Sequence, residues 1–505
     1  MSATLLFSFV IGYFLILLVV AYFTSRNSNN DSFFIGNKNS NWMLVAFGMI
    51  GTSLSGVTFV SVPGTVGISG FAYFQVVIGY VIGYVLIAFV LLPLYYRLNL
   101  TSIYHYLQTR FGIVSYKTGA LFFIISRTLG ATARLYLVIN VLQIFILDKL
   151  NVPFGATTFV ILLMILLYTF EGGVKTIVFT DTLQTSFMLL GLIVTIVYIM
   201  HNMGGSLGSV MSELNEKGLS RIFNTDVNSS AFFVKHILGG AAITVAMTGL
   251  DQEMMQKNIS VKNLKDSQKN MMTFTFIMAI VIFLFLLLGG LLYLYAAQQS
   301  INVPADDLFP TIALYHLPTW VSIIFIIGLI SALFPSADGA LTALTSSFCI
   351  DILGMKRKEE WDEKKRKRIR LTVHFLFAFI FFLFVLGFKL MNNKSIIDVI
   401  LKVAGFTYGP LLGLFAFGIL TKRVINDKYS LLVCLIAPLI ILGVDIVNNV
   451  DWYIKLNLLG EWLNGVKEFS ASLFGSFRIG YEVLIYNGIL TYLGLLIISK
   501  KPAKG

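Results

Sequence analysis

Charge is scarce in this sequence. Only 12% of its 505 residues are Asp, Glu, Lys or Arg, and 57% are hydrophobic. Because a soluble chain carries roughly twice this share of charged residues, the composition excludes a water-soluble globular protein and is typical of a polytopic membrane protein. The net charge of +12 is then explained by basic loops on the cytoplasmic side of a membrane, and nucleic-acid binding is not expected.

Cysteine, histidine and the common catalytic motifs are also scarce or missing. The two cysteines, Cys349 and Cys434, both lie in apolar runs, and the five histidines are scattered. These numbers exclude a disulfide framework and a cysteine metal site. The sequence has no HExxH, no GxxxxGK[ST] and no GxSxG, so the common metalloprotease, nucleotide-binding and hydrolase motifs are missing. We expect that the protein is not an enzyme.

Long apolar runs take the place of the missing charge. Since about 20 apolar residues cross a bilayer as a helix, hydropathy predicts about thirteen membrane spans. They cover residues 3–25, 42–68, 72–97, 116–147, 153–172, 176–200, 231–255, 270–297, 320–348, 370–390, 398–420, 429–447 and 480–499. An odd number puts the termini on opposite sides, and most of the 37 Lys and Arg residues become cytoplasmic if the N-terminus is outside. We therefore expect a multi-pass plasma-membrane protein, in a bacterium an inner-membrane protein, with a cytoplasmic C-terminus.

The second and seventh spans are interrupted by residues that weaken helices. The stretch 48–67, GMIGTSLSGVTFVSVPGTVG, mixes glycines and a proline with hydroxyl residues, and the seventh span ends in a polar segment after Gly249. Loosened backbone is tolerated in a membrane only where protein or a water-filled cavity covers it. Interrupted helices at corresponding positions of inverted repeats indicate a transporter site near the midplane. We expect one transporter domain with these parts: an extra helix at 3–25, a first repeat at 42–200, a second repeat at 231–420 and two C-terminal helices at 429–499.

Two carboxylates lie inside predicted spans, where ionisable groups are costly and are candidates for function. Asp181 lies in the sixth span, and Asp338 lies in the ninth beside Pro335 and several hydroxyl residues. Oxygen ligands suit a hard cation such as sodium, and two carboxylates at one site cannot both stay charged without a cation. We expect the pair to approach within about 6 Å and to share one sodium ion, or one proton when sodium is absent. The alternative is that each forms a structural ion pair, for which the sequence offers three partners: Arg127, Arg134 and Lys402.

Two arginines lie inside the fourth span. Arg127 and Arg134 are seven residues apart and therefore share one face of a helix. An inward-facing guanidinium binds a carboxylate through two parallel hydrogen bonds. The spacing thus predicts either a substrate-binding arginine or a partner that neutralises Asp181 or Asp338.

Five stretches of the chain resemble the sodium/solute symporters. This family includes bacterial sialic acid and proline symporters and the animal sodium-coupled glucose, iodide and vitamin carriers. The stretches are SLSGVTFVSVPG (53–64), TSIYHYLQTRFG (101–112), YTFEGGVKTIVFTDTLQ (168–184), GLDQEMMQKN (249–258) and FPSADGALTALTSSFCIDIL (334–353). The third is similar to the family's GG–TD–Q signature. The fourth is similar to its DQxxxQR motif, with Lys257 in place of the Arg.

The resemblance implies a fold and a sodium site. The fold is an all-α polytopic membrane protein with about 13 transmembrane helices in the 5+5 inverted-repeat, leucine-transporter-like arrangement. The family's shared sodium site uses oxygens from the second and ninth spans, which match four residues here: Gly51, Leu54, Ala332 and Ser336. Pro335 stands where sialic acid carriers have a hydroxyl ligand, so one ligand is missing. A further sodium site in those carriers matches Asp181 and Asp338, together with two positions that have lost their serines.

The resemblance also implies where a solute binds. The hydroxyls that contact the substrate of sialic acid carriers match Ser53, Ser55 and Thr58. Their carboxylate-binding Arg is replaced by a glycine here, and Arg134 lies one turn further along, where it would substitute. Tyr73 completes the expected substrate-binding set. Because the match is incomplete, we do not carry sialic acid over as the substrate.

The sequence thus predicts a sodium-coupled symporter that imports a small polar or anionic organic solute by alternating access. Its partners would be sodium, the solute and the lipid bilayer, and the chain would act as a monomer. One rival is a proton-coupled carrier of the same fold that uses Asp181 and Asp338. A membrane-embedded transferase would need a His/Asp or metal constellation at a membrane face, and a channel would need a continuous polar pore. Neither feature is visible in the sequence.

Overall fold

The computed structural model describes residues 3–25, 40–169, 173–358, 360–391, 396–455 and 463–501. Most of these residues are α-helical, as predicted. In the described part of the chain, the strands β1 (Val424–Ile425) and β2 (Ser499–Lys500) form a short antiparallel pair that joins the segment after α18 to the end of α22. Gly172, one of the glycines in the GG–TD–Q signature, lies outside the described residues.

The helices follow one another along the whole chain. Those of the first half are α1 (Ala3–Ser25), α3 (Trp42–Ser53), α4 (Gly56–Ser69), α5 (Tyr73–Leu86), α6 (Leu92–Arg97), α7 (His105–Arg110), α8 (Ile113–Leu142), α9 (Phe154–Thr169), α10 (Gly173–Met203) and α11 (Leu207–Glu216). Those of the second half are α12 (Phe233–Thr244), α13 (Gln252–Ile259), α14 (Leu264–Gln298), α15 (Ala305–Thr311), α16 (Thr319–Ser347), α17 (Glu363–Met391), α18 (Ile396–Leu420), α19 (Ser430–Asn448), α20 (Val450–Lys455), α21 (Leu463–Phe474) and α22 (Val483–Ile497).

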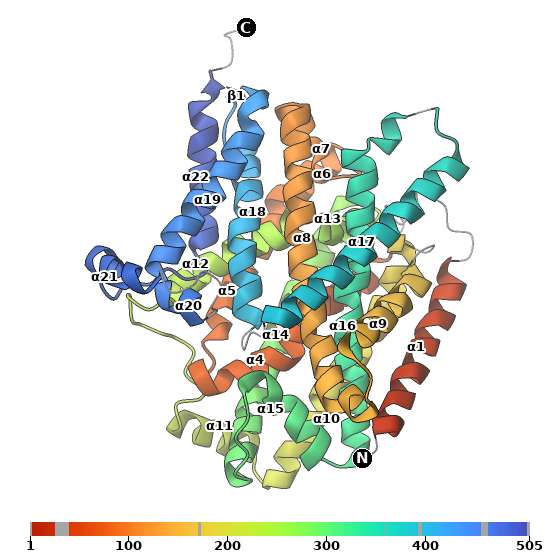
Figure 1. Ribbon diagram of the computed structural model, residues 1–505, viewed down its shortest axis with the longest axis vertical. Helices are drawn as coiled ribbons and strands as arrows, with labels where there is room; N and C mark the ends of the chain where they lie inside the picture. The colour runs from red at the N-terminus through yellow and green to blue at the C-terminus, as the bar shows by residue number, and fades with distance from the viewer. Residues whose placement is uncertain are drawn as a thin grey trace.

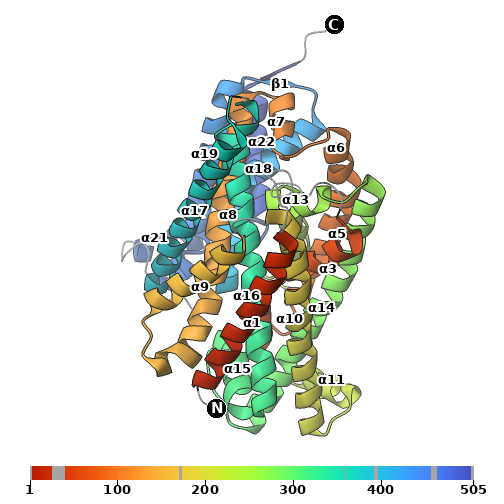
Figure 2. The same cartoon turned by 90° about the vertical axis from the view of Figure 1, so that its right-hand side faces the viewer.

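The predicted spans correspond to helices of the structure. Among the described residues, 9 helices are long and apolar enough to cross a membrane, and two bent helix pairs raise the number to 11. The two remaining predicted spans, 153–172 and 480–499, fall on the shorter apolar helices α9 and α22. The start of α1 and the end of α22 lie at opposite ends of the bundle in both views (Figure 1, Figure 2).

Both predicted interruptions are confirmed. The chain bends by 57° between α3 and α4 and by 65° between the helix that starts at Phe233 and α13. The first break, defined here as Leu54 and Ser55, separates two helices rich in glycine and hydroxyl residues. The second break, defined as Leu250 and Asp251, follows a π-helical turn over Val245–Gly249. In each case small residues and competing polar side chains weaken the helix where it ends.

Long helices hold the two broken pairs in the centre of the bundle. α8, α10, α14 and α16 run along its long axis (Figure 1, Figure 2), and α16 packs against both α10 and α8. α5 packs closely on α12 because a Cβ at Gly79 or at Gly240 would collide with the backbone of the other helix. α18 approaches α22 in the same way at Gly409, which faces Asn487. Small residues at such contacts let membrane helices approach closely, so the broken helices are held in a rigid frame.

Candidate functional site

The first break leaves backbone oxygens without partners. α3 ends at Ser53 and α4 begins at Gly56. No donor in the described part of the chain bonds to the carbonyl oxygen of Gly51 or of Leu54. Both oxygens lie at the C-terminal end of α3, where the helix dipole carries partial negative charge. The first break therefore combines unsatisfied oxygens with a potential that favours a cation.

A further unused oxygen lies on α16, a helix that packs against the broken pair. Both α3 and α4 pack against α16. The hydroxyl of Ser336 is buried and has no hydrogen-bond partner within the described ranges. Pro335 lies inside the helix and has no N–H, so the carbonyl of Ser331 loses its helical donor. Oxygens of this kind bind hard cations. The sodium ligands stay a prediction that fits this chemistry: Gly51, Leu54, Ala332 and Ser336.

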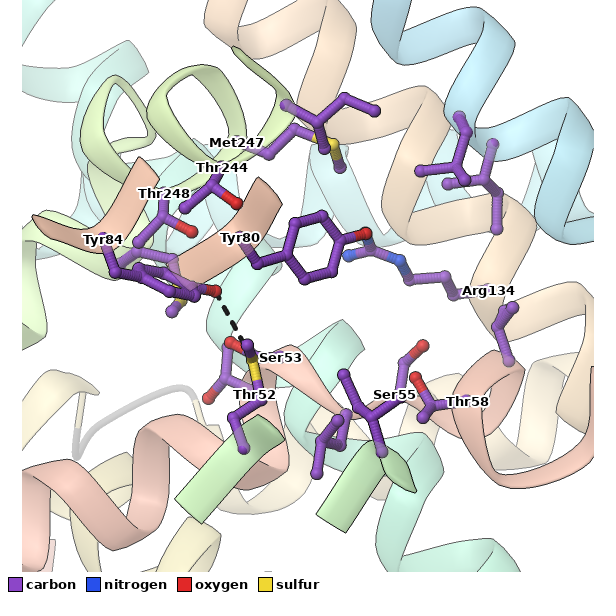
Figure 3. A pocket seen from close by; sticks show the side chains of 18 of the residues that line it. Thr52, Ser53, Ser55, Thr58, Tyr80, Tyr84, Arg134, Thr244, Met247 and Thr248 are labelled. Atoms are coloured by element: carbon purple, nitrogen blue, oxygen red, sulfur yellow. Dashed lines mark hydrogen bonds between the residues drawn. The ribbon is translucent and has the colours of Figure 1, made fainter. Parts of the chain in front are cut away.

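A cavity of about 100 Å³ adjoins the first break. Its wall brings together side chains from the two broken pairs and from α5, α8, α14 and α18. All five residues predicted to bind the solute line this one cavity: Ser53, Ser55, Thr58, Tyr73 and Arg134. Figure 3 shows the hydroxyls of Ser55 and Thr58 on one side and the guanidinium of Arg134 pointing toward Tyr80. The structure thus collects polar groups that are far apart in the sequence, while their role as solute ligands stays a prediction.

Sequence reasoning missed one wall of the cavity. Tyr80 and Tyr84 of α5 line it together with Tyr73, and the hydroxyls of Tyr73 and Tyr80 lie 3.2 Å apart. The hydroxyl of Tyr84 donates to the sulfur of Met278 at 3.5 Å. A signal was present in the sequence, because tyrosines seven and four residues apart fall on one helix face. Their spacing would have added a hydroxyl-bearing aromatic wall to the predicted site.

The two arginines of α8 both line the cavity but differ in their partners. Arg127 is buried and forms a short ion pair with Glu253, and its Nη1 atom lies 3.8 Å from Oδ2 of Asp251. Arg134 lines the cavity and has no ion-pair or hydrogen-bond partner among the described residues. The seven-residue spacing puts both side chains on one face of α8. The acidic residues at the start of α13, however, form ion pairs only with Arg127 among these two. Arg127 is therefore neutralised by the protein, whereas Arg134 meets no acidic partner among the described residues.

The second break is closed by protein groups. The carboxylate of Asp251 accepts hydrogen bonds from the backbone N–H groups of Glu253 and Met254 and so caps α13. The hydroxyl of Tyr95 donates to the carbonyl of Gly249 at 2.7 Å, and that of Tyr104 donates to the carbonyl of Leu250 at 2.8 Å. The backbone groups freed by this bend are therefore satisfied internally, as a buried break in a membrane requires.

Asp181 in α10 forms an ion pair that sequence reasoning did not anticipate. Its Oδ2 atom lies 2.6 Å from Nζ of Lys257 in α13 and accepts a hydrogen bond of 3.1 Å from the hydroxyl of Thr52. Two of the partners considered from the sequence form ion pairs elsewhere. Arg127 pairs with Glu253 and Asp251, as described above, and Lys402 pairs with Asp445 at 2.8 Å.

Asp338 in α16 has no ion pair of its own in the part of the chain that the structure describes. Its Oδ2 atom accepts a hydrogen bond of 2.7 Å from the hydroxyl of Tyr168, and its Oδ1 atom accepts one of 2.5 Å from the N–H of Gly339. Asp181 and Asp338 are both fully buried, and Lys257 forms its ion pair with Asp181. That these carboxylates share a free cation stays a prediction.

Fold and site together define a class of protein. Two broken helices in the centre of a membrane bundle, a cavity beside one break and unused oxygens next to that cavity are typical of a secondary transporter. The sequence profile described as the sodium:solute symporter family matches residues 33–434. The chain belongs to the sodium:solute symporter family.

Similar proteins agree with this assignment. The sodium/sialic acid symporter SiaT of Proteus mirabilis (strain HI4320) is 23% identical over 428 residues, which cover 81% of this chain and 82% of that protein. The sodium/glucose cotransporter 1 of Oryctolagus cuniculus is 22% identical over 469 residues, covering 83% of this chain and 68% of that protein. A solved Na+-coupled sialic acid symporter in a substrate-bound, outward-open state has a TM-score of 0.81 at 18% identity and covers 98% of this chain and 99% of its own. The protein is therefore a sodium-coupled symporter of a small solute with the fold of that structure.

Proposed function

We propose that this symporter imports a small organic anion together with sodium across the plasma membrane, with its N-terminus outside and its C-terminus in the cytoplasm. One observation carries the proposal: the guanidinium of Arg134 faces the cavity without an acidic partner in the described structure. An unpaired charge inside a membrane is costly. A carboxylate on the solute would neutralise it and accept two parallel hydrogen bonds from it.

The cavity favours a compact solute. Its volume of about 100 Å³ is similar to the roughly 150 Å³ of an engineered cavity that holds benzene. Hydroxyls of Ser53, Ser55 and Thr58 supply hydrogen bonds on one side, and the sulfur of Met247 and the ring of Tyr80 add soft apolar surface on the other. This lining suits a small carboxylate with a short polar or apolar body. A bulky sugar acid would require the cavity to widen.

Sodium and solute are coupled through the first break. Leu54, a proposed sodium ligand, lies directly between Ser53 and Ser55, which line the solute cavity. Sodium bound to the carbonyls of α3 and to Ser336 of α16 would fix these three residues in one conformation. Each ligand then binds better when the other is present, which is a coupling free energy between two sites. The repeats proposed at 42–200 and 231–420 would rock around this site to give alternating access.

The proposal is tested on purified protein and on proteoliposomes with a panel of small carboxylic acids, each paired with its neutral amide. We expect an acid to stabilise the protein against heat in sodium more than its amide does, because ligand bound to the folded state raises stability. Arg134→Gln should weaken acid binding about 10–100-fold, since hydrogen bonds to charged groups contribute about 1.5–3 kcal/mol. Arg134→Lys should bind weakly as well, because it keeps the charge but loses the planar fork.

Lys117→Gln is the matched control, since it removes an exposed cation from the same helix away from the cavity. It should leave acid binding unchanged. Equal responses to acids and amides, or full acid binding by Arg134→Gln, would show that the solute is not recognised through a carboxylate at Arg134.

A further inference from the structure

Lys257 has an unusual position for a lysine. Its side chain is only 3% exposed and lies in the middle of the bundle, on α13. Its Nζ atom lies 2.6 Å from Oδ2 of Asp181, 2.5 Å from the hydroxyl of Thr52 and 3.6 Å from Oε1 of Glu253. Lysines are almost never fully buried unless they are paired. Here the ammonium joins three elements, α13, α10 and α3.

The surroundings of this ammonium are those of a bound cation. An ammonium has three donors and no acceptor, and the groups around it are oxygens of two carboxylates and one hydroxyl. Buried carboxylates need a positive charge close by. Lys257 supplies that charge from the protein itself.

We propose that the ammonium of Lys257 is a tethered cation that occupies, between Asp181, Glu253 and Thr52, the position where a free sodium ion would otherwise bind. The carboxylates of Asp181 and Glu253 then share a cation that cannot dissociate from the protein. The inference rests on the proposed sodium site at Ser336 for the ion that is transported. It follows that the protein binds one sodium ion per chain and couples each solute to one sodium.

A purely structural ion pair predicts a different behaviour. If Lys257 only stabilises the bundle, removing it weakens the fold and creates no new ion site. If it stands in for sodium, removing it leaves Thr52, Asp181 and Glu253 around a vacated position that a sodium ion fills. The two readings therefore differ in the number of sodium ions bound once the lysine is gone.

The test counts radiolabelled sodium bound to the purified protein without any solute, with choline chloride to hold the ionic strength constant. We expect one ion for the natural protein and one for Lys257→Arg, which keeps a tethered cation. Lys257→Met should bind two. Lys257→Met combined with Asp181→Asn should bind one again, because the new position has lost its carboxylate.

Thermal unfolding in sodium and in choline gives a second readout on the same four proteins. Sodium should raise the unfolding temperature of Lys257→Met more than that of the other three, because only this variant gains a second ion in the folded state. One bound ion in folded Lys257→Met, or two in the natural protein, would overturn the proposal. If Lys257→Met does not fold, Lys257→Gln takes its place in the count, and two bound ions then support the proposal while one overturns it.

Failure of the main sodium site is distinguishable from failure of this inference. Ser336→Ala should lower the count in the natural background, because it removes a ligand of the transported ion. If it does not, the proposed ligand Ser336 is wrong. The difference between Lys257→Met and its Asp181→Asn double variant still decides whether Lys257 replaces an ion.

Discussion

Two helix breaks lie at the centre of this transporter. Both arise where small and polar residues weaken a helix, but the backbone carbonyls that they free differ in whether they find hydrogen-bond donors. Both bend the chain, by 57° at the first break and by 65° at the second. At the second break, Asp251 caps α13 and two tyrosine hydroxyls bond the freed carbonyls. At the first break, the carbonyls of Gly51 and Leu54 have no donor among the described residues.

The difference teaches how a broken membrane helix becomes either structure or site. A bend frees backbone groups that must be satisfied inside the bilayer. Where neighbouring helices supply aromatic hydroxyls and an acidic cap, the break becomes a fixed part of the scaffold. Where they supply hydroxyls and leave carbonyls unused, the break has free oxygens for the ion and the solute that we propose to bind there. The same contrast separates the paired Arg127 from the unpaired Arg134.

The largest effect is expected at the second break. Arg127→Met leaves Glu253 buried beside Asp251 with its main cation removed. Removing one partner of a buried pair costs about 3–5 kcal/mol, so the variant should unfold at a much lower temperature or fail to accumulate. Arg134→Met is the matched control and should retain its stability while losing solute binding. If Arg127→Met and Arg134→Met were equally stable, the assignment of Arg127 to structure and of Arg134 to ligand binding would be wrong.

A smaller effect is expected from the tyrosines that satisfy the second break. Tyr104→Phe removes the hydroxyl that donates to the carbonyl of Leu250. An unsatisfied buried acceptor costs about 1–3 kcal/mol, which chemical or thermal unfolding in detergent will measure. Tyr80→Phe, which changes a hydroxyl at the cavity, should instead alter solute affinity with little change in stability. The comparison fails if Tyr104→Phe is as stable as the natural protein.

Much of this architecture was predictable from the sequence, because it depends on local properties. Apolar runs predicted the spans. Glycines, hydroxyl residues and a proline predicted the first interruption, and glycines followed by a polar segment predicted the second. Ser53, Ser55 and Thr58 were proposed from a family resemblance and Arg134 from its place inside a predicted span, and together with Tyr73 they line one cavity. The family assignment is confirmed by the matching profile.

The pairing of charges was not predictable. Sequence spacing showed that Arg127 and Arg134 share a helix face, but only the approach of α13 decides which of them meets Glu253. Lys257 was noticed as a departure from the DQxxxQR motif, yet its ion pair depends on how α10 and α13 cross. Asp181 and Lys257 are 76 residues apart in the sequence. Their contact depends on how the helices pack, and the local sequence pattern does not predict that packing.

The most direct test of the account is the sodium dependence of a single serine variant. Ser336→Ala removes a buried hydroxyl that has no partner in the described structure, so it should fold normally. Ser346→Ala is the control, because this buried hydroxyl of the same helix already donates to the carbonyl of Thr342 at 2.8 Å. Sodium binding and sodium-activated uptake, measured over a range of sodium concentrations, should weaken several-fold in Ser336→Ala and stay unchanged in Ser346→Ala. Unchanged sodium affinity in Ser336→Ala would contradict the claim that the first break and α16 together hold the transported ion.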